Sequence, residues 1–414
     1  MKVSADNIRY NLNHLFQLVF EVTDMCNLRC KYCGYADLYE GYDERENLKF
    51  PFQRAKLIID YLYSLWSKNQ CENIVQPILV GFYGGEPLLN VPFIQEVIAY
   101  IESLKPVGKV FRYNMTTNAM LLDRYMDFLV EKKFNLLISL DGNKEGQGYR
   151  VDVAGHDSFD RVYSNVCLLR ERYPEYFKEY VMFNSVLHNK NSVESIYSFI
   201  KGTFRKEPII SPLNGSGIRK DKLENFFQTY RNYSESIQEA SNCEAFKNEL
   251  FIRNPETRQL LDYIYQRSEN VFISYNELLF PINQSSEITS GTCTPFSKKM
   301  FVTVKGKILQ CERINHEFAL GQVTDSGVEL DLEKAAQQHN DYVSRYARQC
   351  KSCGHRKACV QCVYQIDDIH EATSLCRSYC SDGQIKQADA RSLVYLDQHP
   401  ELYRRILKEV SVRG

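Results

Sequence analysis

Six apolar runs that alternate with segments of helical apolar spacing constrain the fold of this 414-residue chain more than any other feature. The runs are rich in Val, Ile, Leu and Phe, which is typical of buried strands. Strands joined through helices predict a parallel sheet with helices outside it. The expected strands are 15–22, 77–83, 110–115, 134–140, 179–187 and 208–212, and the expected helices are 52–66, 92–104, 121–133, 158–173 and 192–201.

No GxGxxG motif follows the first strand, which favours a barrel or partial barrel over a dinucleotide-binding sheet. In a barrel of this kind the chemistry lies at the C-terminal ends of the strands. A cysteine-rich loop follows the first strand, and polar segments end three others: Gly84-Gly85-Glu86-Pro87, Thr116-Thr117-Asn118-Ala119 and Ser139-Leu140-Asp141-Gly142. We expect these segments to share one site, although a turn explains Asp141 equally well.

The loop after the first strand, Cys26-Asn27-Leu28-Arg29-Cys30-Lys31-Tyr32-Cys33, carries three cysteines. Three thiolates on one loop can face one point, and soft sulfur ligands select iron–sulfur clusters, zinc or copper(I). Zinc motifs usually contain CxxC pairs that complete a tetrahedron. Three cysteines without a local fourth instead favour a 4Fe–4S cluster with one open iron. Three buried structural cysteines are the alternative.

The CxxxCxΦC spacing of these cysteines, with Tyr32 as the aromatic residue, resembles the signature of the radical S-adenosylmethionine (SAM) enzymes. The resemblance implies that the open iron chelates the amino and carboxylate groups of SAM, and that an electron cleaves SAM to methionine and a 5′-deoxyadenosyl radical. This radical abstracts hydrogen from an unactivated C–H bond, while the protein positions the reactants and excludes water. The implied fold is α/β, a partial (β/α)6 barrel.

The same resemblance assigns SAM-binding roles to residues at the strand ends. Glycines let a backbone approach a ligand closely, and Glu86 resembles the partner of the SAM amino group. Arg150 resembles an arginine that pairs with the SAM carboxylate, although a solvated arginine is the alternative. Tyr32 would pack near the adenine, or be a core tyrosine. The assigned residues are Tyr32, Gly84, Gly85, Glu86, Asn118, Ser139 and Arg150.

Eight of the fourteen cysteines lie in the C-terminal part of the chain. Eight thiolates meet the demand of two 4Fe–4S clusters, and they would equally satisfy two zinc ions. They are Cys293, Cys311, Cys350, Cys353, Cys359, Cys362, Cys376 and Cys380. Their order resembles the cysteine-rich α+β SPASM domain, whose pattern is C-x(9–15)-G-x4-C, C-x2-C-x5-C-x3-C and a last C. With the cluster of the first loop, the resemblance implies three 4Fe–4S clusters.

The resemblance implies auxiliary cluster I on Cys293, Cys311 and Cys362. Auxiliary cluster II would use the three cysteines of the C-x2-C-x5-C motif and one of Cys376 or Cys380. Cys362 arrives one residue early, and two cysteines follow where the pattern asks for one. Cluster I would take the spare cysteine as its fourth ligand or keep an open iron for the substrate.

Glu312, directly after Cys311, is the candidate catalytic residue. In sulfatase-maturing relatives an aspartate follows the corresponding cysteine and is the proposed base. Glutamate at this position would either accept a proton from the substrate or solvate a cluster edge. Upstream of it, the segments 299–304 and 307–309 flank Gly306 as a hairpin.

The expected organisation has five parts. They are a short extension (1–14), the barrel (15–212), a helical connector (213–290), the SPASM domain (291–382) and C-terminal helices (383–414). The connector is expected to contain one helix over 224–240 and a second over 256–268, with Asn254 as its N-cap. Helices over 384–394 and 400–410 are expected to close the chain.

Charge and composition exclude several classes of protein. A net charge of −1 argues against nucleic acid as the main partner. No apolar stretch reaches the ~18 residues that a membrane span needs, and the N-terminal residues carry no secretory signal. Fourteen cysteines in a large chain of this kind indicate metal rather than disulfides. Because oxygen destroys exposed clusters, a reducing cytoplasm is the expected compartment.

SPASM-bearing radical SAM enzymes act largely on peptides or proteins. The resemblance therefore favours a maturase that modifies a ribosomally made precursor peptide by thioether formation, carbon–carbon cross-linking or epimerisation, and it extends to the Bacteroidales-type peptide maturases. Only 25 residues precede Cys26, so the winged-helix module that grips a leader peptide in many relatives is not expected. Leader recognition would fall to a separate protein, be built differently or be unnecessary. Flavodoxin or ferredoxin is the expected electron donor.

Two alternatives remain from the sequence. The first is an anaerobic sulfatase maturase, which oxidises a Cys or Ser residue to formylglycine but expects aspartate where Glu312 stands. The second is a non-catalytic iron–sulfur scaffold or electron carrier. A scaffold would not need the segments that contain Glu86 and Ser139 beside the cysteine loop.

Overall fold

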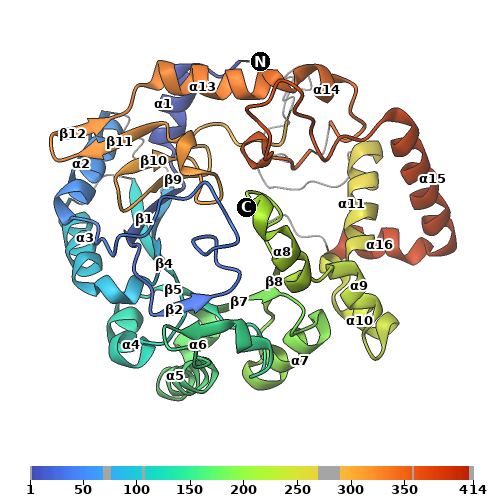
Figure 1. Cartoon of the computed structure of the whole chain (residues 1–414), viewed down its shortest axis with the longest axis horizontal. Coiled ribbons are helices and arrows are strands. Elements are labelled where there is room, and N and C mark those ends of the chain that lie inside the picture. Colours follow the sequence, from blue (N-terminus) through green and yellow to red (C-terminus); the bar gives the residue numbers. More distant parts are fainter. Residues whose placement is uncertain (1, 69–75, 105–107, 269–289, 357–358, 410–414) are drawn as a thin grey trace. The chain divides into compact units, whose positions relative to one another are not determined.

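The chain folds into two compact units in the computed structural model, which describes residues 2–68, 76–104, 108–268, 290–356 and 359–409 (Figure 1). The first unit contains Val3–Tyr233 and Cys293–His339. The second contains Ser234–Thr292 and Asn340–Gly414, together with the first two residues. In the part of the chain that is described, no helix is both long and apolar enough to cross a membrane.

A parallel sheet forms the centre of the first unit, as the alternation of patterns predicts. Its strands follow one another in chain order, and each neighbouring pair is parallel. The strands are β1 (Gln17–Thr23), β3 (Gln76–Gly84), β4 (Lys109–Thr117), β5 (Asn135–Ser139), β7 (Val181–Leu187) and β8 (Ile209–Pro212). The predicted α/β fold with six parallel strands is confirmed.

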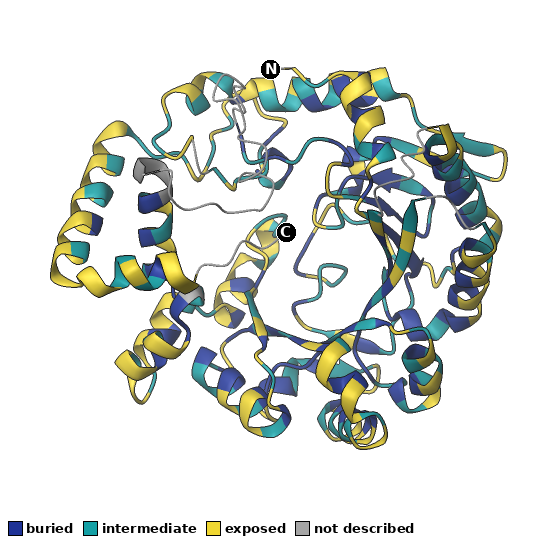
Figure 2. Ribbon diagram, turned by 180° about the vertical axis from the view of Figure 1, so that it is seen from behind, coloured by how far each residue is buried: buried dark blue, intermediate teal, exposed yellow. Residues whose placement is uncertain are grey.

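Helices follow the strands and cover the outer face of this sheet (Figure 1). Figure 2 shows that each presents a buried side to the sheet and an exposed side to solvent, which is the arrangement that helical apolar spacing predicts. These helices are α2 (Phe52–Lys68), α3 (Val91–Leu104), α4 (Leu122–Glu131), α5 (Phe159–Arg172), α6 (Pro174–Tyr180) and α7 (Val193–Phe204). The unit also contains α1 (Ala5–Asn13), before the first strand, and α8 (Leu223–Thr229), whose Phe226 packs against Tyr32 of the cysteine loop.

Four strands from the cysteine-rich part of the chain extend the same sheet beyond β1. β9 (Lys299–Val302) lies parallel to β1, and β10 (Lys307–Leu309), β11 (Gly321–Thr324) and β12 (Gly327–Glu329) follow as antiparallel neighbours. The predicted hairpin around Gly306 is therefore confirmed. The predicted boundaries of the SPASM domain, 291–382, fall in both compact units, because the hairpin packs with the barrel.

A second, two-stranded sheet lies at the end of β1 and was not predicted. It pairs β2 (Leu28–Cys30), within the cysteine loop, with β6 (Arg150–Asp152). Both strands have three residues, which is too short for an alternating pattern to be recognised. The small sheet ties the cysteine loop to the segment that follows β5.

The second unit is mainly helical. A small apolar core of Phe251, Leu260, Ile264 and Ile406 holds it together. The predicted N-cap is confirmed, because the Asn254 Oδ1 atom accepts a 3.1 Å hydrogen bond from the Glu256 backbone N–H. The helices are α9 (Tyr233–Gln238), α10 (Cys243–Glu249), α11 (Pro255–Ser268), α14 (Ala347–Lys351), α15 (Asp382–Gln398) and α16 (Pro400–Glu409), and α13 (Leu332–Arg345) crosses the boundary between the units.

The prediction of one continuous helix over 224–240 is wrong, because the chain leaves the helical conformation between α8 and α9. Tyr230 adopts extended backbone angles (φ −66°, ψ 141°). The Thr229 carbonyl oxygen accepts a 2.9 Å hydrogen bond from the Asn189 N–H, so a contact with the barrel ends the helix. The part of the predicted connector from 269 to 289 lies outside the described residues.

Candidate active site

The cysteine loop leaves β1 and is held at both ends by backbone hydrogen bonds. Asp24 is buried, and its two carboxylate oxygens each accept a 2.7 Å bond, from the N–H groups of Glu46 and Leu48. At the other end, the Lys31 N–H donates to the Tyr149 carbonyl oxygen at 3.1 Å. The loop is therefore fixed to the barrel before any ligand binds.

The predicted site residues line a cavity of about 660 Å³ at the C-terminal ends of the parallel strands. Three cysteines of the loop, the Gly84-Gly85-Glu86 turn, two residues from later strand ends and the candidate catalytic residue all contribute to its wall. The sequence-predicted residues that line it are Cys26, Cys30, Cys33, Gly84, Gly85, Glu86, Asn118, Ser139, Arg150 and Glu312. The segments that follow the parallel strands thus meet at one edge of the sheet, as parallel strands require, whereas Glu312 follows the antiparallel strand β10.

Each loop cysteine has a nitrogen donor from another part of the chain. The Asn118 Nδ2 atom lies 3.7 Å from the Cys26 Sγ atom, and an Arg150 Nη1 atom lies 3.9 Å from the Cys30 Sγ atom. The Arg45 Nη2 atom lies 3.4 Å from the Cys33 Sγ atom. Hydrogen bonds and positive charge at the sulfur atoms favour thiolates, and thiolates are the ligands of iron–sulfur clusters.

Three half-buried thiols with such donors fit a cluster that leaves one iron open. Burial raises the pKa of Cys26, and raises that of Cys30 to about 12 even though Arg150 opposes the rise, so a ligand must displace the protons. Among the described residues, no three Cys, His, Asp or Glu side chains already converge at the spacing of a single bound ion. The fit therefore rests on the donor set and its surroundings.

The two glycines after β3 bring the backbone against the end of β1. The Gly85 N–H donates to the Thr23 carbonyl oxygen, and the Glu86 N–H donates to the Met25 carbonyl oxygen, both at 2.8 Å. A Cβ atom at Gly84 or Gly85 would collide with one of these carbonyl oxygens, and Gly84 has a φ of +132°. This close approach is why the turn needs glycine.

Glu86 is almost fully buried, and its carboxylate is held by three donors. They are the Leu88 N–H at 3.1 Å, the Thr117 hydroxyl at 2.7 Å and the Asn118 N–H at 2.7 Å. Burial raises the pKa of Glu86 to about 7, against the effect of these hydrogen bonds. The carboxylate is thus fixed in the cavity wall and close to its titration point, where a cationic ligand would favour the ionised form.

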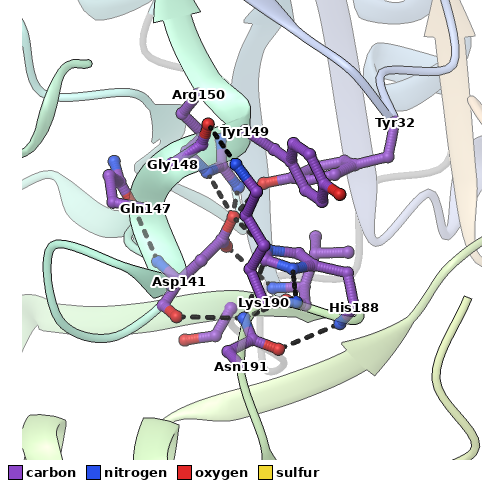
Figure 3. A network of polar contacts seen from close by, with 12 residues as sticks. Tyr32, Asp141, Gln147, Gly148, Tyr149, Arg150, His188, Lys190 and Asn191 are labelled. Carbon is purple, nitrogen blue, oxygen red and sulfur yellow. Dashed lines mark hydrogen bonds and ion pairs between the residues drawn. The ribbon is translucent and has the colours of Figure 1, made fainter. Parts of the chain in front are cut away.

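Arg150 and Tyr32 point into a buried polar network around Asp141 (Figure 3). Arg150 forms a bidentate pair with the Asp141 carboxylate, with distances of 3.0 and 3.2 Å. The Tyr32 hydroxyl donates to the same carboxylate, and its ring stacks on His188. Arg150 reaches the cavity wall, whereas Tyr32 is not among the described lining residues. The SAM-binding roles of both residues stay predictions.

Sequence reasoning missed several other residues of the cavity wall, among them Arg45, Tyr42 and Tyr83. Arg45 belongs to the polar segment after the cysteine loop, where a charged run usually indicates a solvated surface. Burial raises the pKa of Tyr42 to about 12, and Cys311, Glu312 and Cys33 add to the rise. The Tyr42 ring lies between Tyr35 and His316, with ring centroids 5.2 and 5.3 Å away. Tyr83, the residue before the glycine pair, lines the same cavity. No sequence pattern marks the two tyrosines.

Glu312 is held by an ion pair. The Lys299 Nζ atom lies 3.0 and 3.1 Å from its carboxylate oxygens, and the Cys311 Sγ atom lies 3.7 Å from one of them. Burial acts to raise the pKa of Glu312, but the Lys299 ammonium outweighs it and holds the pKa below its usual value. The residue therefore faces the cavity as a carboxylate.

The second unit contains six of the cysteines predicted to bind auxiliary clusters, and Cys293 and Cys311 belong to the first unit. Burial raises the pKa of Cys350 to about 11, and the thiols of Cys359, Cys376 and Cys353 add to the rise. Burial also raises the pKa of Cys380, and the Cys353 thiol adds to the rise. The assignment of these cysteines to clusters stays a prediction.

Comparisons with known proteins agree with the barrel. Residues 20–201 match the family described as the Radical SAM superfamily. The chain is 30% identical over 196 residues to a cysteine-type anaerobic sulfatase-maturating enzyme of Clostridium novyi, which is 46% of this chain and 49% of that protein. It is 26% identical over 394 residues to an enzyme of the same description from Clostridium perfringens, which is 87% of this chain and 93% of that protein.

Among solved structures, the fold is similar to native anSMEcpe with bound AdoMet and the Cp18Cys peptide. The TM-score is 0.62, the sequence identity is 19%, and the likeness covers 96% of this chain and all of that one. At this identity the likeness concerns the fold, including the cysteine-rich C-terminal part. The match to the Clostridium novyi enzyme spans about half of that protein's length.

Proposed function

Because residues 20–201 match the Radical SAM superfamily, we propose that the cavity at the strand ends binds SAM and that the enzyme uses it to modify a residue of a peptide chain. The observation that supports this most directly is one cavity lined by the three loop cysteines, Glu86 and Glu312. When bound there, an open 4Fe–4S cluster and SAM supply a 5′-deoxyadenosyl radical that takes a hydrogen atom from the substrate.

The residues of the chain divide this task among them. Cys26, Cys30 and Cys33 would hold the cluster, and the Glu86 carboxylate would bind the ammonium group of SAM. The glycines bring that carboxylate beside the loop. Glu312, which lines the cavity, would accept a proton from the substrate.

Two classes of peptidyl substrate are candidates. A ribosomally made precursor peptide is the prediction from the SPASM-like cysteine pattern. A sulfatase is the second candidate, because the alignment with the Clostridium perfringens sulfatase-maturating enzyme spans 93% of that protein. Glutamate in place of the expected aspartate at position 312 favours the first candidate.

The test is SAM turnover by anaerobically reconstituted enzyme with dithionite and two peptides, a candidate precursor and a sulfatase-derived peptide that contains the target cysteine. Each peptide is deuterated at the position to be attacked. Transfer of deuterium to 5′-deoxyadenosine identifies the substrate, and mass spectrometry separates formylglycine from a cross-link. SAM cleavage without transfer from any peptide would contradict the peptide substrate, and no cleavage at full iron content would favour the scaffold alternative.

We expect SAM affinity to fall about tenfold between pH 8 and pH 6. With a Glu86 pKa of about 7, the carboxylate changes over this range from mainly ionised to mainly protonated, and only the ionised form attracts an ammonium group. Calorimetric titration of the reconstituted enzyme measures the effect. Glu86→Gln should bind weakly at every pH, whereas Glu102→Gln, an exposed carboxylate on α3 paired with Lys132, should keep the wild-type profile. A Glu86→Gln variant with unchanged pH dependence would contradict the assignment.

If Glu312 is the proton acceptor, Lys299→Met should move the acid limb of the pH–rate profile to higher pH. The lysine holds the pKa of Glu312 down, so its removal lets burial raise that pKa. The measurement is the pH dependence of peptide modification. The Glu312→Gln variant should lose the acid limb of the pH–rate profile and most of the rate of peptide modification. An unmoved limb in Lys299→Met would assign it to another group.

A further inference from the structure

Arg45 is fixed beside the cysteine loop through the backbone of its segment. The Asp24 carboxylate, at the start of the loop, accepts 2.7 Å hydrogen bonds from the N–H groups of Glu46 and Leu48. The Thr23 hydroxyl donates to the Leu48 carbonyl oxygen at 2.6 Å. The segment that carries the arginine is therefore tied to the end of β1, from which the cysteine loop also departs.

The side chain of Arg45 lies between the ring of Tyr35 and the thiol of Cys33. Its guanidinium carbon is 4.7 Å from the centroid of the Tyr35 ring, and its Nη2 atom is 3.4 Å from the Cys33 Sγ atom. The ring is held at its far end, because the Tyr35 hydroxyl donates to the buried Glu21 carboxylate at 2.6 Å. A flat cation on a fixed aromatic face keeps its place, so the guanidinium group is positioned before any ligand binds.

The guanidinium group of Arg45 has hydrogen-bonding capacity that the described residues do not use. Its Nε atom is buried and has no hydrogen-bond partner. Glu21, on which the Arg45 charge acts, does not supply one, because its two oxygens accept from the Tyr35 hydroxyl and from the Val304 N–H at 2.8 Å. A buried donor without a partner and a cation without an ion pair both cost free energy. They indicate an anionic ligand with acceptor atoms at this point of the cavity wall.

A cluster on the loop meets both requirements, because its thiolate and sulfide atoms are anionic acceptors. We propose that Arg45 is a positioning residue that donates to the Cys33 thiolate, supplies its unused Nε–H to an acceptor of the bound cluster and raises the reduction potential of that cluster. The proposal rests on the iron–sulfur site of the proposed function and not on the identity of the peptide. Hydrogen bonds to the sulfur atoms and net charge are determinants of cluster potential, and a cation favours the reduced state because that state carries one more negative charge.

Two substitutions of Arg45 should lower the potential by different amounts. Arg45→Gln removes the charge, so the equilibrium constant for one-electron reduction of the loop cluster should fall at least tenfold, which is a potential about 59 mV more negative. Arg45→Lys keeps the charge but offers one nitrogen in place of the planar guanidinium group. Its potential should therefore lie between those of Arg45→Gln and the wild type. A loss of packing alone would not order the three potentials by charge and donor number.

The measurement is an anaerobic redox titration of the reconstituted full chain, followed by electron paramagnetic resonance. The signal that changes on addition of SAM identifies the cluster of the loop. Arg54→Gln is the matched control, since it removes the same charge from α2, where the Arg54 Nε atom lies 2.8 Å from the exposed Asp325 carboxylate. Its potential should equal that of the wild type. Iron content, melting temperature and SAM affinity are measured for every variant.

Potentials of both Arg45 variants equal to that of the control would overturn the proposal. Weaker SAM binding by Arg45→Gln at an unchanged potential would also overturn it and would assign the arginine to SAM. If Arg45→Gln does not hold the loop cluster, Arg45→Lys decides the matter, since a potential below that of the wild type supports the proposal and an equal one contradicts it. A wild type without a SAM-sensitive signal would overturn the cluster site and this proposal with it. Because no arm needs a peptide, a negative result is distinct from a wrong peptide substrate.

Discussion

Replacement of Cys26, Cys30 and Cys33 together by alanine will abolish formation of 5′-deoxyadenosine. These three thiols line one cavity, each with a nitrogen donor at its sulfur atom, and no other cysteine among the described residues lines it. Without them the open iron has no site beside Glu86. The measurement is SAM turnover with dithionite after anaerobic reconstitution, in which the product should fall to the level of the enzyme-free control.

Iron content makes this prediction quantitative. Three 4Fe–4S clusters require about twelve irons per chain, so the triple variant should retain about eight if the C-terminal cysteines bind two clusters. The control is Cys167→Ala/Cys243→Ala, since neither thiol lines the cavity; it should keep the iron and the activity. If the wild-type enzyme bound only about four irons per chain, the radical chemistry would stand, but zinc would be the favoured ligand of the C-terminal cysteines. Residual SAM cleavage by the triple variant would contradict the loop as the site.

Gly85→Ala should be the most damaging of the single methyl additions. A Cβ atom at this position would meet the Met25 backbone carbonyl oxygen, which cannot move without pulling the cysteine loop away from the turn. Overpacking of this kind costs about 1–3 kcal/mol or more of unfolding free energy. It should also displace Glu86 and Cys26 relative to each other, so SAM turnover should fall by at least tenfold. Denaturant unfolding and 5′-deoxyadenosine formation measure the two effects.

Gly202→Ala is the matched control for this substitution. Gly202 lies in α7, and an added Cβ atom would meet no other atom within 4 Å. Alanine in a helix interior is favoured over glycine by about 0.5–1 kcal/mol, so the control should be slightly more stable and fully active. If Gly85→Ala were as stable and as active as the wild type, the cysteine loop and the Gly84-Gly85 turn would separate more easily than their backbone hydrogen bonds indicate.

The strands and the positions of their polar ends could be predicted because burial on both faces leaves a continuous apolar run in the sequence. The C-terminal ends of parallel strands meet at one edge, so the residue order alone is enough to place Glu86, Asn118 and Ser139 with the cysteine loop. Their convergence on one cavity follows from topology, which the alternation of strands and helices already determines.

The partners of the thiols could not be predicted in the same way. Arg45 lies in a charged run, Asp141 ends a strand where a turn was an equal explanation, and the pairing of β2 with β6 joins segments about 120 residues apart. These contacts depend on which side chains the folded barrel brings together, and local spacing contains no signal for them. The break after Thr229 has the same origin, since a tertiary hydrogen bond overrides a helical pattern.

The parallel pairing of β9 with β1 has a consequence for how far the barrel can be isolated. β1 carries the cysteine loop, yet its Val19 and Phe20 pair with residues more than 280 positions later in the chain. A fragment that ends at residue 201, where the family match ends, would lack β9 and leave β1 as an exposed edge strand. An exposed edge strand can pair with another copy of the chain. The Val304 N–H would also be lost from buried Glu21, to which it donates at 2.8 Å. The segment that matches the family, residues 20–201, is therefore shorter than the part of the chain that the folded barrel needs, which includes β9.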